Sequence, residues 1–577
     1  MMQSPYITGL PRRMGRALSA MFARDGFEKH RRKWEIVHEV QSEPGPLPLD
    51  ADEAAIYQAA DAAARECYSY CQRYKLDALV LDAIGAFCDR MEVAQPVGAE
   101  PREKIARATD KAWWLRSIRK AHARRFEHTA IKLGFVGAKT GLYISDESAM
   151  RQRERNRQNA RLLDSREMKN EFGQTYTVAQ LADLGMANKT LRRGELMTRI
   201  RGFEEIAQDL GHVGMFWTVT CPSKYHAVGG ENERYGGFSP KEAQEYLVHM
   251  WALIRSALDK LGIQPYGFRI AEPHTDGCPH WHLLLFVAPE HQAAMEKTVR
   301  AYALAEDGDE PGAQENRVKL VKIEPGRGTA AGYIAKYIAK NIDGAHVGDY
   351  RTRDGETVRA EDMFDKGEIS LAERVTYWAQ IWGIRQFQQL GGAPVGVWRE
   401  LRRIKEETVR HAPETIKAAW RAVQKIEGSD EIAKQASWAD YLRAQGGATV
   451  GRNAAVQLAT RLTVIEGRYG SYEDRRPCGV FAAGDGRAVY ESVRYQWTAV
   501  DGAGVVAVPW TGVNNCTQID HEAVGLRMWL ATRALSDEVK NKNFRPPMWV
   551  DWPEIRRTAK EIEKKTEKFA ARRGGHG

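Results

Sequence analysis

The segment 272–286 contains the residues of this chain that are best suited to metal chemistry. His280 and His282 flank a single tryptophan and run directly into the apolar stretch 283–287. Because successive side chains of a strand point to opposite faces, a strand here places both imidazoles on one face. Two such imidazoles can bind a divalent metal ion. The alternative is a pair of polar residues at a frayed strand end, and the surrounding residues decide between the two.

Glu272 precedes the two histidines by a connection that is short enough to form a hairpin. If Glu272 pairs opposite His280, then Ile270 pairs opposite His282, and all four side chains project from one face. Two nitrogens and a carboxylate oxygen then bind one side of an ion and leave its other side open. Open coordination positions are what a catalytic metal needs.

The mixed nitrogen and oxygen ligands favour Mn²⁺, and Mg²⁺ is the second candidate when it is abundant. A structural zinc ion is an alternative, because it needs a fourth protein ligand and Cys278 lies close in the sequence. His274 and Asp276 could also join the ligands. For these two residues we expect turn and solvent roles.

A second set of reactive side chains lies in residues 329–340, which predict a helix. One face of that helix carries Tyr333, Tyr337, Lys336 and Lys340, and isoleucines on the opposite side can pack on a sheet. Free tyrosine ionises near pH 10, but a neighbouring lysine or metal favours the phenolate nucleophile. Half-buried packing is the alternative, and the metal ligands upstream favour catalysis.

Two basic runs precede these motifs, and the first is interleaved with tryptophans. A single run of this kind is usually a solvated helix face. Two in succession fit contacts with a phosphate backbone and predict nucleic-acid binding. The candidate DNA-binding residues are Arg116, Arg119, Lys120, Arg124, Arg125, Arg151, Arg153 and Arg155.

The pattern of elements predicts an α+β fold. Its core has the order β-α-β-β-α-β-α, whose first six elements match the split βαβ, ferredoxin-like arrangement. That arrangement predicts an antiparallel sheet with helices packed on one side. We expect strands at 216–221, 266–272, 280–287 and 317–323, and helices at 240–261, 289–305, 329–340, 371–389 and 397–410.

The chain is long enough for several domains. We divide it into an N-terminal arm and linker (1–49), a helical, basic, DNA-binding region (50–210), a catalytic domain (211–345), a helical extension (346–410) and a mixed region of unknown role (411–577). In the last region we expect helices through 415–446, a β-like passage at 479–512 and a charged helix at 552–573.

The overall composition indicates the kind of cellular compartment in which the protein works. Lys and Arg number 85 against 76 Asp and Glu, a net charge of +9, which is modest for 577 residues. Seven cysteines without paired spacing favour a reducing compartment over a disulfide framework. No apolar run approaches the ~18 residues of a membrane span, and we see no secretory signal. We therefore expect a cytoplasmic protein without a membrane partner.

Four stretches make the chain resemble the HUH endonucleases, which nick single-stranded DNA, and most closely the phage replication gene A protein (GPA) family. They are residues 216–226, 272–282, 333–340, and 382–387 with 394–402; the run 192–197 is also similar. The resemblance covers roughly residues 110–410. Many relatives carry threonine at the position of Cys278, which is outside the candidate ligands. Residues 411–577 lie outside the stretches that carry the resemblance.

The resemblance implies a rolling-circle replication initiator with an HUH endonuclease core. The metal polarises a phosphate oxygen, and Tyr333 or Tyr337 attacks to give a 5′-phosphotyrosine link and a 3′-OH primer. The second tyrosine cuts the regenerated origin after one round, and the displaced strand is rejoined. Lys336 and Lys340 assist the phosphate or the phenolate. The expected substrate is single-stranded or supercoiled origin DNA in the cytoplasm of a bacterial host.

Host proteins complete this scheme. The chain has no phosphate-binding Gly-x-x-x-x-Gly-Lys-[Ser/Thr] loop, so we do not expect it to unwind DNA. A host replicative helicase and a DNA polymerase are therefore the expected partners.

Three other classes of protein share part of this pattern. A plasmid relaxase or HUH transposase shares the chemistry, but relaxases generally carry an N-terminal tyrosine and three histidine ligands. A metal-dependent amidohydrolase needs a (β/α)₈ repeat and further ligands downstream, which the sequence lacks. A non-catalytic DNA-binding replication scaffold would use only the basic helices.

Overall fold

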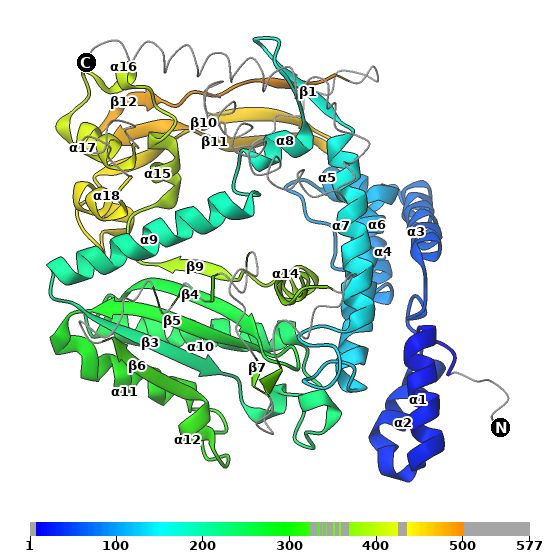
Figure 1. Ribbon diagram of the computed structural model, residues 1–577. Coiled ribbons are helices and arrows are strands. Elements are labelled where there is room, and N and C mark those ends of the chain that lie inside the picture. The colour runs from blue at the N-terminus through cyan, green and yellow to red at the C-terminus, as the bar shows by residue number, and fades with distance from the viewer. Residues whose placement is uncertain are drawn as a thin grey trace, which may run out of the picture. The chain divides into compact units, whose positions relative to one another are not determined.

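The computed structural model describes most of the chain outside its C-terminal part (Figure 1). The described residues are 7–323, 350–351, 357–358, 369–424 and 436–500, with positions 332, 334, 337, 338 and 342. None of the helices in these ranges is long and apolar enough to cross a membrane. The helix predicted at 552–573 lies outside the described residues.

A five-stranded antiparallel sheet forms the centre of the fold, with strand order β6-β3-β5-β4-β9 (Figure 1). Along the chain, helix α10 follows β3, and α11 follows the β4–β5 hairpin. The prediction of an antiparallel sheet in a mixed α and β chain is confirmed. The elements are β3 Val213–Thr220, α10 Pro240–Lys260, β4 Tyr266–Pro273, β5 Pro279–Val287, α11 Gln292–Ala303, β6 Val318–Ile323 and β9 Phe387–Leu390.

The edge strand β9 corrects one expectation. We predicted a helix over residues 371–389, but α14 (Leu371–Trp382) ends earlier and the chain then adds β9 beside β4. Gly383 has φ +69°, a left-handed conformation that ends the helix and that glycine adopts without strain. The run from Phe387 to Leu390 is too short to show strand periodicity by itself.

Both faces of the sheet are covered, so the prediction of helices on one side only is wrong. Trp217 and Leu285 pack with residues of α10 and α11 on one face. Phe216 and Leu284 pack on the other face with residues of α9 (Lys189–Asp209). Every residue of β4 and β5 is buried, and near-continuous apolar runs of this kind are typical of strands covered on both faces.

Two helices occupy most of residues 12–42, within the segment for which we expected a polar arm and linker. Helices α1 (Arg12–Asp25) and α2 (Arg31–Ser42) bury an apolar stripe, including Met14, Leu18 and Phe22, in the core that covers the α10 face of the sheet. The apolar spacing of α1 follows a helical period, which the high local charge obscured in the sequence.

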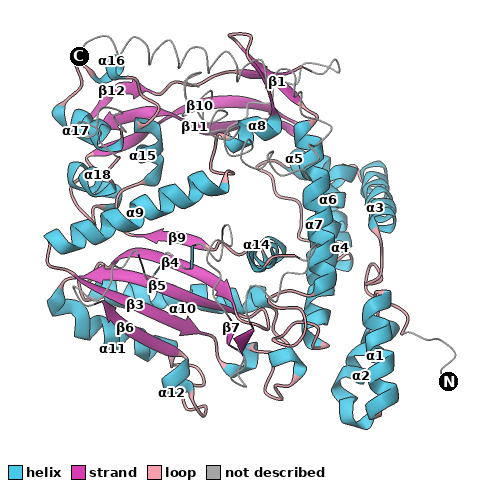
Figure 2. Ribbon diagram, viewed as in Figure 1, coloured by secondary structure: helices cyan, strands magenta, loops and turns pink. Residues whose placement is uncertain are grey.

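The following region is helical as predicted (Figure 2). Four of its helices enclose a core of their own around Trp114. Its helices are α3 Glu53–Arg73, α4 Asp77–Arg90, α5 Pro101–Ala108, α6 Lys111–Lys132, α7 Asp146–Asp164 and α8 Val178–Asp183. A small sheet joins β1 (Glu167–Asn170) to β2 (Thr175–Thr177) and to β13 (Trp497–Ala499), a strand over 300 residues away along the chain.

The segment after the central sheet is mixed, as expected. Its helices are α15 Val395–Leu401, α16 Glu406–Val409, α17 Glu414–Val423 and α18 Trp438–Gln445. Its strands β10 Val456–Gly467, β11 Gly470–Ala482 and β12 Asp485–Glu491 form one antiparallel sheet. Strands β7 (Tyr350–Arg351) and β8 (Thr357–Val358) form a separate pair.

Close packing of α9 against α18 gives a test of the fold. A Cβ added at Gly202 would lie 2.5 Å from the Cβ of Trp438, so we expect Gly202→Ala to lower the free energy of unfolding by about 1–3 kcal/mol. Gly194 is on the same helix with nothing within 4 Å of an added Cβ, so Gly194→Ala should instead stabilise by about 0.5–1 kcal/mol. Denaturant unfolding measures both, and equal effects would contradict the packing.

Candidate active site

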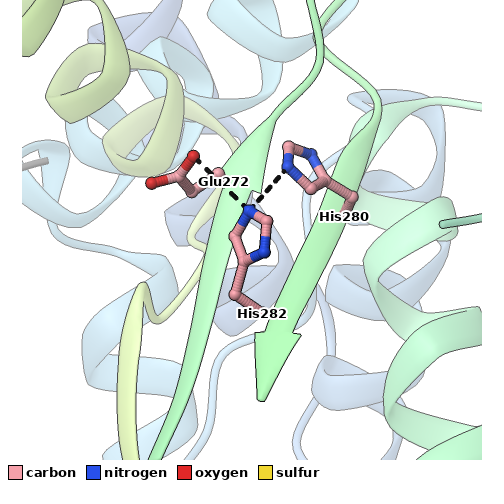
Figure 3. A group of neighbouring side chains, drawn as sticks. All are labelled: Glu272, His280 and His282. Carbon is pink, nitrogen blue, oxygen red and sulfur yellow. Dashed lines mark hydrogen bonds and ion pairs between the residues drawn. The ribbon is translucent and has the colours of Figure 1, made fainter. Parts of the chain in front are cut away.

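The β4–β5 hairpin has the register that the sequence predicted. Glu272 pairs opposite His280, and Ile270 pairs opposite His282. The connecting turn is closed by the His274 N–H, which donates to the Cys278 carbonyl at 2.7 Å. Since side chains alternate along both strands, this register places Glu272 and the two histidines on one face of the sheet (Figure 3).

The three side chains come together as one potential ligand set. The Nε2 atoms of His280 and His282 are 3.0 Å apart, and Nε2 of His282 is 3.8 Å from Glu272 Oε2. The ligand atoms of all three lie within 4.8 Å of one another. Two donors that bind one ion at about 2.1 Å in neighbouring octahedral positions lie about 3 Å apart. The geometry therefore fits a single divalent ion.

Burial distinguishes this group from an ordinary surface cluster. Glu272 is 1% exposed, His280 9% and His282 5%. A carboxylate taken this far from water loses hydration, and opposite charge or metal coordination is what usually compensates. Among the described residues, this is the group of His, Cys, Asp and Glu that could hold a metal ion.

Thr218 fixes the orientation of His282, a role that the sequence analysis missed. Thr218 lies opposite His282 on β3, and its Oγ1 is 3.1 Å from His282 Nδ1. A hydrogen bond at Nδ1 leaves Nε2 as the ligand atom. The alternation of β3 predicts which face carries Thr218, but no local signal tells which strand lies beside it.

Among the described residues, Tyr337 is a tyrosine that lies against this cluster. Its ring centroid is 4.1 Å from that of His282, and it stacks on Phe216 at 5.6 Å. Tyr337 is half-buried, and it stands at a helical position between two buried isoleucines, Ile334 and Ile338, which pack on the sheet as predicted. Tyr333, Lys336 and Lys340 lie outside the described residues.

The other polar residues of the hairpin have separate roles. Asp276 is buried and accepts hydrogen bonds from the backbone N–H groups of Val228 and Cys278, with His226 Nδ1 at 3.3 Å. This is the turn role that we expected, although away from solvent. Cys278 is buried outside the three-residue group, with its Sγ 3.8 Å from the Pro279 carbonyl, and burial raises the pKa of its thiol.

The candidate DNA-binding cations mostly contact other parts of the chain. Arg119 and Arg155 both pair with Glu53, and Arg124 and Arg125 donate to backbone carbonyls. Further contacts are Arg151 with Glu147, Arg153 with Glu373 and Arg116 with Tyr469; Arg124 also lowers the pKa of Lys120. These contacts fit the alternative of a structural helix face, and DNA binding by these residues stays a prediction.

Asp276 gives a test of the hairpin that holds the site. Burial alone would raise the pKa of Asp276, but the His226 and His274 imidazoles hold it well below its ordinary value of about 3.9. A carboxylate with a depressed pKa stabilises the fold at pH values above its ordinary pKa. This stabilisation is lost as the pH falls through the pKa of the folded state. We expect Asp276→Asn to cost about 3 kcal/mol of unfolding free energy at pH 7.

Because the carboxylate stabilises the fold only while it is ionised, the difference in unfolding free energy between Asp276→Asn and the wild type should decrease below pH ~4. Denaturant unfolding over this pH range measures it, with the exposed Asp259→Asn variant as the control. A difference that stayed constant or grew toward acid pH would contradict this role of the carboxylate.

Comparison with known proteins adds an independent finding. Residues 49–345 match the model of the family described as "Bacteriophage replication gene A protein (GPA)". Over 487 residues the chain is 33% identical to the "Probable replication protein P12" of Pseudoalteromonas phage PM2, covering 83% of this chain and 71% of that relative. No solved structure matches the chain.

Two further relatives are longer than the part that aligns. The "Replication gene A protein" of Escherichia phage 186 is 39% identical over 435 residues, which is 72% of this chain and 59% of the relative. The "Probable replication endonuclease from prophage-like region" of Shigella boydii serotype 4 (strain Sb227) is 32% identical over 429 residues, 71% of this chain and 52% of the relative. The chain thus spans less than two thirds of either relative.

Proposed function

The chain belongs to the bacteriophage replication gene A protein family, and we propose that it initiates rolling-circle DNA replication as a single-strand endonuclease. The observation that carries this proposal is the packing of the Tyr337 ring against His282 of the Glu272–His280–His282 group. A candidate nucleophile thus lies beside a group that can hold a metal ion, over one face of the sheet. The name of the Shigella relative, a replication endonuclease, supports nuclease chemistry.

The three ligands would hold Mg²⁺ or Mn²⁺, which when bound polarises a non-bridging oxygen of the scissile phosphate. The contact of Thr218 with His282 Nδ1 would leave Nε2 of His282 to bind the ion. The burial of Glu272 excludes water from one side of the site, where charge interactions are correspondingly stronger.

In the proposed reaction, the Oη of Tyr337 or Tyr333 attacks phosphorus and forms a new P–O bond. The bond from phosphorus to the 3′ oxygen breaks, and that oxygen takes up a proton as the 3′-OH. The 5′ end stays on the protein as a phosphotyrosine, which conserves the bond energy, so rejoining needs no ATP. Attack by a 3′-OH on the phosphotyrosine reverses the step and closes the displaced strand into a circle.

The remaining candidates have supporting roles in this scheme. The second tyrosine would cut the regenerated origin after one round, and Lys336 and Lys340 would offset the phosphate charge. A DNA polymerase would extend the 3′-OH, and a host helicase would separate the strands, because the sequence contains no phosphate-binding loop of its own.

Formation of a covalent adduct tests the proposal. The protein is incubated with circular single-stranded DNA and Mn²⁺ or Mg²⁺, and the products are separated by denaturing electrophoresis. We expect an adduct that chelation prevents and that the Tyr333→Phe/Tyr337→Phe double variant reduces by about 10³-fold or more, since the nucleophile is lost.

The matched control is Tyr302→Phe on α11, whose tyrosine is 36% exposed on the other face of the sheet and should leave the adduct unchanged. An adduct that survives in the double variant would contradict tyrosine chemistry. No adduct on any single-stranded substrate, including the cognate origin, would support a DNA-binding scaffold instead.

A further inference from the structure

A basic cavity of about 810 Å³ lies beside β9, on the opposite side of β4 from β5. Residues of α9, β4, β9 and α15 line it, with part of the loop before β10. A cavity of this size holds a ligand of the size of one or two nucleotides, and it is too small for a double helix. Its charged lining consists of one carboxylate, Glu195, and five arginines, Arg192, Arg199, Arg385, Arg399 and Arg452.

The positive charge of this cavity exceeds what its one carboxylate can neutralise. Glu195 is already shared, since Arg399 donates to both of its oxygens at 2.7 and 3.0 Å and Arg199 lies 3.3 Å away. No carboxylate pairs with the other three arginines in the part of the chain that the structure describes. Uncompensated guanidinium groups in a concave site favour a bound anion.

Arg199 makes the strongest case for a ligand. It is 8% exposed, and burial lowers the pKa of its guanidinium to about 10. One of its NH groups is held by Gln389 Oε1 at 3.3 Å, whereas its buried Nε has no hydrogen-bond partner among the described residues. A buried guanidinium with an unmet donor is costly unless an acceptor reaches it.

The cavity opens on the same face of the sheet as the candidate metal ligands. Phe268 lines the cavity, and Glu272 follows on the same strand four residues later, about 13 Å away at the rise of a β-strand. Phe387, also in the lining, pairs with Ile270, which pairs with His282, so the three lie in one row across about 10 Å. One single strand of DNA can therefore reach both places.

The cavity brings together sequence motifs that have no role in the proposed reaction. Three of the stretches that carry the family resemblance, 192–197, 382–387 and 394–402, come from three separate elements. Each contributes at least one arginine to the cavity. Residues so far apart in sequence meet only because α9 and α15 pack over β4 and β9.

We propose that this cavity binds backbone phosphate of single-stranded DNA, a short distance along the strand from the phosphate that is cut. The inference rests on the proposed function for the nature of its ligand. Arg199 at the floor and the arginines at the rim would hold the strand so that the scissile phosphate reaches Tyr337. The cavity thereby supplies binding, and the Glu272–His280–His282 group supplies the chemistry.

Charge-matched variants separate this site from general electrostatic attraction. The rim variant carries Arg192→Ala, Arg385→Ala and Arg452→Ala, all exposed in the free protein. The control carries Arg255→Ala, Lys260→Ala and Lys297→Ala, exposed on α10 and α11 over the opposite face. Both lose three positive charges. Fluorescence anisotropy with labelled oligothymidylate is measured in EDTA at several salt concentrations, with inorganic phosphate, thymidine monophosphate and duplex DNA as competitors.

We expect the rim variant to bind oligothymidylate at least about tenfold more weakly, with a salt slope reduced by about 1–2, and the control to stay within about twofold of the wild type. We also expect oligothymidylate to compete better than free phosphate, the mononucleotide or the duplex. If melting shows the rim variant to be unfolded, the single exposed Arg452→Glu variant replaces it. Equal weakening in the rim and control variants, or unchanged binding in the rim variant, would overturn the inference.

The adduct assay separates the two proposals. If the wild type forms the adduct and the rim variant binds DNA as well as the wild type does, the proposed role of the cavity is refuted. The proposed endonuclease activity then stands. Loss of binding in the rim variant, with no wild-type adduct on any substrate, supports the cavity and refutes the endonuclease. Wild-type protein that fails to bind oligothymidylate refutes the cavity.

Discussion

The pairing of β4 with β5 is the constraint on which the rest of the candidate site depends. With Glu272 opposite His280, the carboxylate and both imidazoles face the same way, and the ligand atoms meet within 4.8 Å. A slip of one residue would turn one strand's side chains to the opposite face and separate the carboxylate from the imidazoles. The buried Asp276 in the hairpin turn, which binds two backbone N–H groups, helps to hold this register.

The packing around the hairpin explains how one sheet can serve several tasks. The α10 face is filled by large apolar side chains and provides stability. The other face carries the candidate metal ligands, the half-buried Tyr337 and, toward β9, the arginine cavity. Functional side chains on such a rigid sheet are held more firmly than side chains on loops, which suits the in-line attack on a phosphate that we propose.

The sequence predicted the local features of the site well. His-x-His spacing, a short connection and an upstream Glu272 were sufficient to predict the hairpin register. The isoleucines of the tyrosine helix pack on the sheet as their helical period implied. In each case the residues that determine the arrangement lie within about ten positions of one another. Over that distance, periodicity and turn length determine which side chains share a face.

Features that depend on distant partners were not predictable in this way. Strand β9 pairs with β4 from more than 100 residues away along the chain, and α9 covers the second face by packing on residues of several separate strands. Thr218 shares a face with His282 only because β3 lies beside β5. The arginine cavity combines three stretches for the same reason, so the sequence showed basic residues at 192, 385 and 399 without showing that they meet.

The claim that Glu272, His280 and His282 hold a divalent ion beside Tyr337 can be tested by calorimetric titration of the metal-free protein with Mn²⁺. We predict one site in the wild type, an affinity at least about tenfold lower in a folded His280→Ala variant, and no change in His249→Ala, whose histidine is exposed on α10. Binding that is absent in the wild type, or unaltered in a folded His280→Ala variant, would contradict the claim.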